Sequence, residues 1–303
     1  MYGIEVADEL THAPHGDPAW RESYWIDVVD ATSGVGILAY AGSQPLAGSG
    51  YSLVHVAGPE GVLYQHREFG LELGDDYEPG HSGLEVGPFS AQLRRPLQRQ
   101  AFSYAREAIG IDLEFSSSAP VFDYPWPWTR SRHYEQFGDV TGSLELEGRN
   151  SAISGRGVRD HAWGLRSLRP WRRWLWTTFR ASETSLAWSL CMMEDDERDG
   201  LYGYLLDERG GVHTLRRLQA DVTYEDDRPT AASLNFACGR RDEMEVEATR
   251  CGVIDLSRQD AAKPGGYFFS FLEVAGGPIR GFGTFDVFWR DGVARPDRFE
   301  HGS

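Results

Sequence analysis

The stretch GIDLEFS, residues 110–116, alternates apolar with polar side chains. Its apolar residues fall at every second position, with Asp112 and Glu114 between them, as on a half-buried β-strand. The same period of two recurs in GSLELEG, EMEVEAT and GTFDVFWR, and turn sequences such as GPEG, DERGG and KPGG separate the strands. Many antiparallel strands with tight turns predict an all-β protein built from barrels or sandwiches.

Helical periodicity is nearly absent, and the best candidate is a short helix at residues 130–137. It follows PVFDYPWPW, residues 120–128, whose three prolines cannot lie inside a central strand. We therefore expect an N-terminal β domain over residues 1–125, a Pro- and Trp-rich junction at 126–137, and a C-terminal β domain over 138–303.

Composition narrows the choice of partners. The chain has 303 residues, 41% of them hydrophobic, and a formal net charge of -16. Such a chain can bury a sizeable core, but its acidity argues against non-specific binding of nucleic acid or anionic membranes, which needs a basic surface. A small molecule is the expected partner.

Cysteines, histidines and the N-terminus bear on cofactors and location. The three cysteines form no CxxC pair and are odd in number, which argues against a disulfide framework or a zinc knuckle. The nine histidines show no metal-ligand spacing, so neither a metal nor a cofactor is expected. No signal-like start or bilayer-length apolar run is present, and we expect a soluble, cytoplasmic protein.

The stretch GRGVRDHAWGLR, Gly155–Arg166, gathers polar groups around an aromatic residue. Asp160 could fix the tautomer of His161 and raise its basicity. Neighbouring residues of a strand point to opposite faces, so sharing one cavity would need a bulge, which the glycines would permit. Alternatively, Asp160 pairs with Arg159 or Arg166, and His161 is a hydrogen-bonded rim residue.

We expect this stretch to be a strand end that bends. His161 and Trp163 would then face a cavity together, because they are two residues apart. Asp160 would point away and hydrogen-bond backbone amides or Arg159.

Arginines and aromatic residues suggest how a ligand would be held. Seven arginines lie between Arg156 and Arg180 with one acid among them, and Arg166 is the expected clamp for an anionic or polar group. The alternative is that these arginines are solvated or paired with acids elsewhere. The expected substrate-binding residues are Trp163, Trp174, Trp176, Trp188, Tyr134 and Glu135. For the tryptophans the alternative is a place in the barrel core, and for Tyr134 and Glu135 it is a capped surface turn.

The segment GVRDHAWG, Gly157–Gly164, resembles the "Gly, aromatic or Arg, Asp-His-x-Trp-Gly" signature of the AttH/CrtC-like group. This group of calycin relatives includes carotenoid 1,2-hydratases, kievitone hydratases, tocopherol cyclases and lipocalin-like Diels–Alderases. ESYW at residues 22–25 and HYEQFGDVTGSLELEG at 133–148 are also similar to members of the group. The resemblance implies two lipocalin-like antiparallel β-barrels packed together, with a ligand cavity near their interface.

The resemblance also implies chemistry on isoprenoids, prenylated phenols or polyenes: protonation of an alkene followed by water capture or cyclisation, or a shape-directed cycloaddition. His161 and Trp163 correspond to pocket residues of the carotenoid hydratases. The Tyr-x-Asp that those enzymes place on the following strand is missing from LAWSLCM, residues 186–192, which argues against carotenoid hydration itself.

We therefore expect a cofactor-independent lyase, hydratase or cyclase acting on an apolar, isoprenoid-derived or polycyclic substrate. His161 or Asp160 would transfer the proton in a Trp-lined cavity, and the substrate would carry an anionic or polar end. Two alternatives stay open, namely a pericyclase and a non-catalytic carrier of a hydrophobic ligand.

Overall fold

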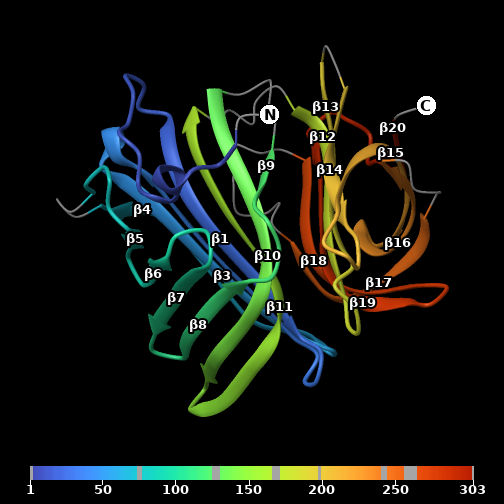
Figure 1. Cartoon of the computed structure of the whole chain (residues 1–303), viewed down its shortest axis with the longest axis horizontal. Coiled ribbons are helices and arrows are strands. Elements are labelled where there is room, and N and C mark those ends of the chain that lie inside the picture. Colours follow the sequence, from blue (N-terminus) through green and yellow to red (C-terminus); the bar gives the residue numbers. More distant parts are fainter. Residues whose placement is uncertain are drawn as a thin grey trace. The chain divides into compact units, whose positions relative to one another are not determined.

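The structure, a computed structural model, describes residues 3–73, 77–124, 130–165, 171–196, 199–239, 244–255 and 265–301. Nearly all of its regular structure is β, and every strand pairing is antiparallel (Figure 1). The predicted all-β class with two barrel-like sheets is confirmed.

The first sheet is nearly closed and runs in the order β4-β3-β2-β1-β11-β10-β8-β7-β6-β5, with β9 paired to β10. Its strands are β1 (Trp20–Asp30), β2 (Val35–Gln44), β3 (Ser49–Gly58), β4 (Gly61–Glu72), β5 (Gly83–Val86), β6 (Phe89–Arg95), β7 (Arg99–Arg106), β8 (Ile109–Ser117), β9 (Phe122–Tyr124), β10 (Arg130–Leu146) and β11 (Arg149–Leu165).

The second sheet closes on itself, because β14 pairs with β15 at the end of the order β14-β13-β12-β19-β18-β17-β16-β15; β20 adds to β15. Its strands are β12 (Trp171–Ala181), β13 (Ala187–Asp195), β14 (Asp199–Leu206), β15 (Val212–Glu225), β16 (Arg228–Cys238), β17 (Met244–Asp255), β18 (Gly265–Gly276), β19 (Ile279–Arg290) and β20 (Arg298–His301).

Helical structure in the described residues consists of two 3-10 turns, η1 (Val6–Glu9) and η2 (Pro45–Ala47). No helix in this part of the chain has the length and apolar character needed to cross a membrane.

The predicted helix at residues 130–137 is wrong, because these residues begin β10. They pair with β11 along their whole length and with β9 from His133 to Glu135. Two ladders of backbone hydrogen bonds outweigh the weak local preference for a helix, as tertiary context commonly does.

The chain forms two compact units, Met1–Val56 with Leu63–Ser167, and Ala57–Val62 with Leu168–Ser303. The division near residue 167 differs from the expected junction at 126–137. Residues 125–129 lie outside the described residues, and residues 130–137 continue the first sheet through β10. The Asp160-His161 stretch therefore belongs to the first unit and not to the second.

Each unit has a core that follows the alternation of its strands. In the first, Ile111, Leu113 and Phe115 of the GIDLEFS stretch are buried within one cluster, as the period of two requires. In the second, Leu175 and Phe179 pack with Trp188 in a separate cluster. Buried apolar faces of this kind are the main source of stability in a β-barrel.

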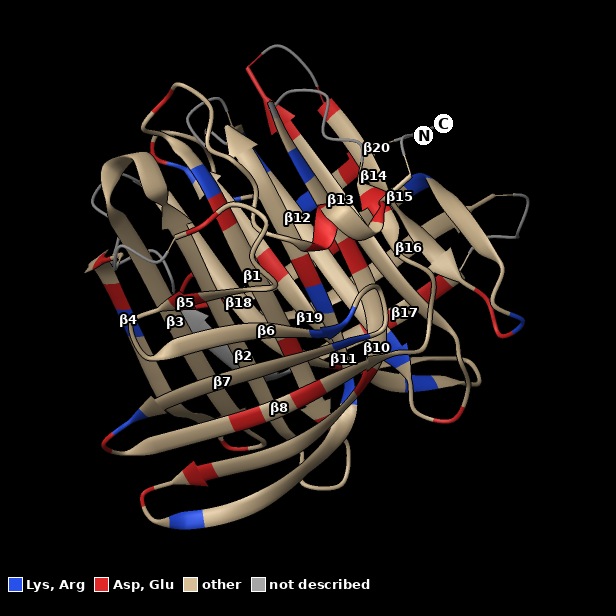
Figure 2. Ribbon diagram, turned by 60° about the vertical axis from the view of Figure 1, so that its left-hand side comes forward, with Lys and Arg blue, Asp and Glu red and all other residues tan. Residues whose placement is uncertain are grey.

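Charged residues are spread over both sheets, and Figure 2 shows segments of Lys or Arg and of Asp or Glu scattered among the other residues of the strands. Ion pairs such as Arg156 Nε to Asp139 Oδ1, at 3.8 Å, and Arg290 Nη2 to Asp196 Oδ1, at 2.8 Å, join them. This pattern fits a chain that carries 46 acidic and 30 basic residues.

Candidate functional site

The stretch from Gly155 to Leu165 lies in β11, which pairs in unbroken register with β1 on one side and β10 on the other. No bulge interrupts either pairing, so the expected bend is absent there. The glycines have a different use: a Cβ at Gly157 would lie 2.0 Å from the carbonyl oxygen of Asp27. Glycine is needed because β1 comes too close for any side chain.

Regular alternation sends His161 and Trp163 to one face of β11 and Asp160 to the other. His161 is 1% exposed, and its ring stacks on Tyr24 with centroids 4.1 Å apart. The edge of Tyr134, opposite it on β10, contacts the same ring. His161 and Trp163 thus share one face of β11, with Tyr134 beside them, but the lining of the pocket described below includes Trp163 and not His161.

The partner of His161 is Glu22, a residue of β1 that is 0% exposed. His161 Nε2 lies 2.7 Å from Glu22 Oε1. His12 Nδ1 lies 2.8 Å from the same oxygen, Oε1. The backbone amide of His12 donates to the other oxygen, Glu22 Oε2, at 2.9 Å. Two imidazoles thus converge on one buried carboxylate.

Glu22 is held in its ionised form. Burial raises the pKa of its carboxyl, but the hydrogen bonds and charges of His12 and His161 outweigh burial and lower the pKa to about 2. An ionised carboxylate can only accept hydrogen bonds. His12 therefore donates from Nδ1 and His161 from Nε2.

Tyr77 completes the surroundings of Glu22. Its hydroxyl lies 2.5 Å from Glu22 Oε2 and 2.7 Å from the His12 carbonyl oxygen. Burial and the Glu22 charge raise the pKa of Tyr77, so it stays protonated and donates. The tyrosine ties the N-terminal segment to the carboxylate.

A second buried charge anchors the same segment. Glu9 is 2% exposed and pairs with Arg159, whose Nη2 lies 3.0 and 3.1 Å from the two carboxylate oxygens. Glu9 also accepts hydrogen bonds from the Tyr134 hydroxyl and from the Leu97 amide. Burial raises the pKa of Glu9, but Arg159 and these hydrogen bonds outweigh burial and lower it. We expected Arg159 to pair with Asp160. The structure instead pairs Arg159 with Glu9.

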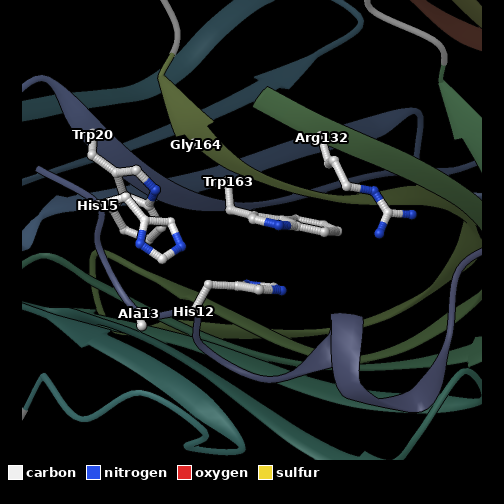
Figure 3. A pocket seen from close by; sticks show the side chains of 7 residues that line it. All are labelled: His12, Ala13, His15, Trp20, Arg132, Trp163 and Gly164. Atoms are coloured by element: carbon white, nitrogen blue, oxygen red, sulfur yellow. The ribbon is translucent and has the colours of Figure 1, made fainter. Parts of the chain in front are cut away.

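A pocket of about 240 Å³ adjoins this network (Figure 3). Its lining comprises His12, Ala13, His15, Trp20, Arg132, Trp163 and Gly164. The rings of His12 and Trp163 are stacked with centroids 4.1 Å apart and planes 6° apart, as Figure 3 shows. His12 thus has one nitrogen on Glu22 and its ring at the pocket, while His161 lies behind it.

His12, Glu22 and His161 are the described residues whose donor atoms could also hold a metal ion, since these atoms lie within 4.8 Å of one another. Ligands bound about 2.0–2.1 Å from a tetrahedral zinc ion are about 3.3 Å apart. The two nitrogens lie 2.7 and 2.8 Å from Glu22 Oε1, which are hydrogen-bond distances. Hydrogen bonds join the three side chains in this structure.

Asp160 and Glu135 lie on the opposite face of β10 and β11, where they are cross-strand neighbours. His133 joins them, with Nε2 3.3 Å from Asp160 Oδ2 and 3.9 Å from Glu135 Oε1. Asp160 and His161 are therefore not brought together, nor are Tyr134 and Glu135.

The other predicted binding residues lie in the second unit. Trp188 lies in the hydrophobic core of the closed sheet and stacks on Phe179 with ring centroids 3.9 Å apart. Trp174 and Trp176 occupy the other face of β12, where their indoles donate to Asp286 and Ser189. These tryptophans do not form one wall.

Among the described residues, none of the arginines between Arg156 and Arg180 lines the pocket. Arg166 lies outside the described residues, and Arg173 pairs with Glu194. The pocket cation is Arg132, from β10, whose guanidinium lies 5.2 Å from the centroid of the Trp163 ring.

Sequence reasoning missed Glu9, His12 and Glu22. The stretch WRESYWIDVVD, residues 20–30, did contain a signal for Glu22, because the period of two places this acid on the face of Tyr24 and Ile26. An acid on an apolar face needs a buried partner. Nothing comparable marks Glu9 or His12, whose segment has no period.

Comparisons with known proteins agree with this architecture. The Nitrosomonas europaea protein provisionally assigned as AttH has a TM-score of 0.69 at 14% identity, over 91% of this chain and 93% of that chain. Kievitone hydratase from Nectria haematococca has a TM-score of 0.69 at 13% identity, over 96% and 94%. CghA with Sch210972 has a TM-score of 0.64 at 12% identity, over 90% and 89%.

These neighbours match the AttH/CrtC-like group that the Asp-His-x-Trp-Gly motif resembles, which confirms the resemblance, and their low identity establishes the fold alone. No curated protein sequence matches the chain. The family described as "Domain of unknown function (DUF7064)" matches residues 5–287. The chain belongs to this family.

Proposed function

We propose that the chain is an enzyme that transfers a proton to or from a small molecule, of the hydratase, hydro-lyase or cyclase type, with its site at the pocket beside Glu22. One observation carries the proposal: the hydrogen-bonded series His161–Glu22–His12 runs from the buried interior to a ring that lines the pocket. General acid–base catalysis uses a positioned side chain to transfer the proton, and this side chain is most often a histidine.

The geometry assigns different roles to the two histidines. His12 donates from Nδ1 to Glu22, which leaves Nε2 to exchange a proton with the substrate. The ionised carboxylate accepts the Nδ1–H bond and holds the His12 ring in its tautomer and orientation, as the aspartate of a catalytic triad does for its histidine. His161, stacked on Tyr24 and sealed from the pocket, is a positioning residue that holds Glu22.

The fold is compatible with this chemistry without determining it. One protein with the same fold is named a hydratase, and another, CghA, has a crystal structure with Sch210972. Both are only 12–13% identical to this chain, so the argument for proton transfer rests on the side chains at the pocket.

Deuterium incorporation tests the proposal without requiring the natural substrate. The protein would be incubated in heavy water with a panel of conjugated ketones and phenols, and carbon-bound deuterium would be measured by NMR. We expect His12→Gln and Glu22→Gln to lower the exchange rate by about two to four orders of magnitude, the usual range for general acid–base catalysis. His213→Gln is the matched control, because His213 lies in the second unit and pairs with Asp207.

If His12→Gln exchanged deuterium at the unsubstituted rate, the assignment would be wrong. Tight binding of ligands with no exchange in any case would instead favour a carrier. A loss of exchange on adding a metal chelator, with recovery on adding zinc, would show that the three side chains act through a metal ion.

A further inference from the structure

The pocket constrains what the proposed enzyme acts on. Its volume of about 240 Å³ is below the range of about 300–1,000 Å³ for drug-sized ligands. The part of a substrate that it encloses is a single ring with a short side chain, and not a long polyene.

The walls favour a flat molecule. Four of the seven lining residues carry planar rings, and Ala13 and Gly164 add little bulk. Figure 3 shows the parallel rings of His12 and Trp163 between Arg132 at one end and Trp20 with His15 at the other. Aromatic rings attract other rings in stacked or edge-on contacts.

The charges favour an uncharged ligand. Arg132 has already two acidic partners, with Nη1 2.9 Å from Asp8 Oδ1 and Nη2 3.4 Å from Asp123 Oδ2. A ligand carboxylate approaching Arg132 would also approach these two carboxylates, and like charges repel. His12 already donates to Glu22, so the imidazole of His15 is a group in the pocket lining that can donate to a carbonyl oxygen.

The reacting bond follows from the strength of the acid, and this step rests on the proposed function. An imidazolium is too weak an acid to protonate an isolated alkene readily. A carbonyl conjugated to the alkene removes this difficulty, because negative charge moves to its oxygen when water adds. The water oxygen bonds to the β carbon as the π bond of the alkene breaks, and His12 Nε2 takes the proton that the water loses. His12 Nε2 then gives this proton to the α carbon. One water molecule is added in total, and His12 regains its starting state.

We propose that the substrate presents to this pocket a compact, flat, uncharged group in which an aromatic ring and a carbonyl flank the reacting double bond. Benzylideneacetone has these features. Cinnamate has nearly the same shape but is an anion, 4-phenylbutan-2-one lacks the double bond, and all-trans-retinal is a long conjugated polyene.

Isothermal titration calorimetry of the full chain with these four compounds tests the proposal. We expect benzylideneacetone to bind at least tenfold more tightly than cinnamate or retinal, and more tightly than 4-phenylbutan-2-one, which is flexible. Trp163→Leu should weaken its binding at least tenfold. Trp176→Leu should leave binding unchanged, because Trp176 lies in the second unit and bonds Ser189. If a variant does not fold, the order of affinities of the four compounds for the unsubstituted protein still decides the test.

Equal or tighter binding of cinnamate or retinal, or no binding of benzylideneacetone at millimolar concentration, would overturn the proposed substrate class. The proposed function is tested separately by formation of 4-hydroxy-4-phenylbutan-2-one or by deuterium incorporation. Binding of benzylideneacetone with neither reaction would contradict proton transfer and leave the ligand class standing.

Discussion

Glu22 is a carboxylate in the interior of a β-sheet unit, where an unpaired charge would be strongly destabilising. Two imidazoles, the Tyr77 hydroxyl and the His12 amide surround it. A group with four hydrogen-bond partners of this kind remains ionised while buried. Because this carboxylate must stay ionised, the stability of the fold depends on pH.

The first prediction concerns that dependence. The pKa of Glu22 is about 2 in the folded chain, below its ordinary 4.5. A lowered pKa stabilises the fold above pH 4.5, and the contribution is lost as the pH falls from about 4.5 to about 2. The shift corresponds to roughly 3 kcal/mol at 1.36 kcal/mol per unit. We expect Glu22→Gln to be less stable than the parent chain at pH 7 and to lose less stability between pH 5 and pH 2.5.

Urea unfolding at several pH values measures this difference. The chain has many other carboxyls, and subtracting the curve of Glu22→Gln from the parent curve isolates the one at Glu22. Parallel curves over the whole range would contradict the assigned hydrogen bonds.

At the scale of elements, residues 3–19 are the least regular part of the first unit and yet supply Glu9 and His12. The contacts that hold them include Glu9 on Arg159, His12 on Glu22, the Tyr77 hydroxyl on the His12 carbonyl, and backbone bonds between Thr11 and residues 80 and 81. The segment is part of the candidate site and not a loose end.

The second prediction tests this anchoring. Tyr77→Phe removes the hydrogen bonds to Glu22 and to the His12 carbonyl but keeps the ring. We expect the amides of Thr11 and His12 to exchange hydrogen for deuterium at least tenfold faster, while amides in β10 and β11 keep their rates. Unchanged exchange at residues 11 and 12 would show that Tyr77 does not hold the segment.

The elements show what a sequence can and cannot predict. GIDLEFS and GTFDVFWR have a clear period of two, and both lie in strands whose alternate apolar residues are buried in a core cluster. In β11 the same period placed His161 with Trp163 and separated them from Asp160. Residues 3–19 have no period, and their position depends on Arg159 and Glu22, the first of them 150 residues from Glu9. Because these partners are distant in the sequence, no local pattern in residues 3–19 predicts the contacts.

At the scale of the molecule, each of the two units has its own hydrophobic cluster. In the second, β12 to β19 form a closed ring in which every strand has two neighbours. A junction at 126–137 would instead separate β10 and β11 from β1 and β8, the strands that they pair with.

The third prediction follows from this division. A fragment of residues 168–303 should give one cooperative thermal transition, because it contains the whole closed sheet. In a fragment of residues 138–303, the added β10 and β11 residues lack their outer partners, and limited proteolysis should trim the fragment to near residue 168. A protease-resistant 138–303 fragment, or an unfolded 168–303 fragment, would contradict the division.

The central claim is that His12, Glu22 and His161 form one hydrogen-bonded acid–base unit at the pocket, and histidine NMR tests it most directly. In protein labelled with ¹⁵N-histidine, His12 Nδ1–H and His161 Nε2–H should both give downfield proton signals that exchange slowly with water. Both signals should disappear in Glu22→Gln, and His15→Gln should preserve them. If the signals of either histidine were those of a free imidazole, or were unaffected by Glu22→Gln, the acid–base unit would not exist.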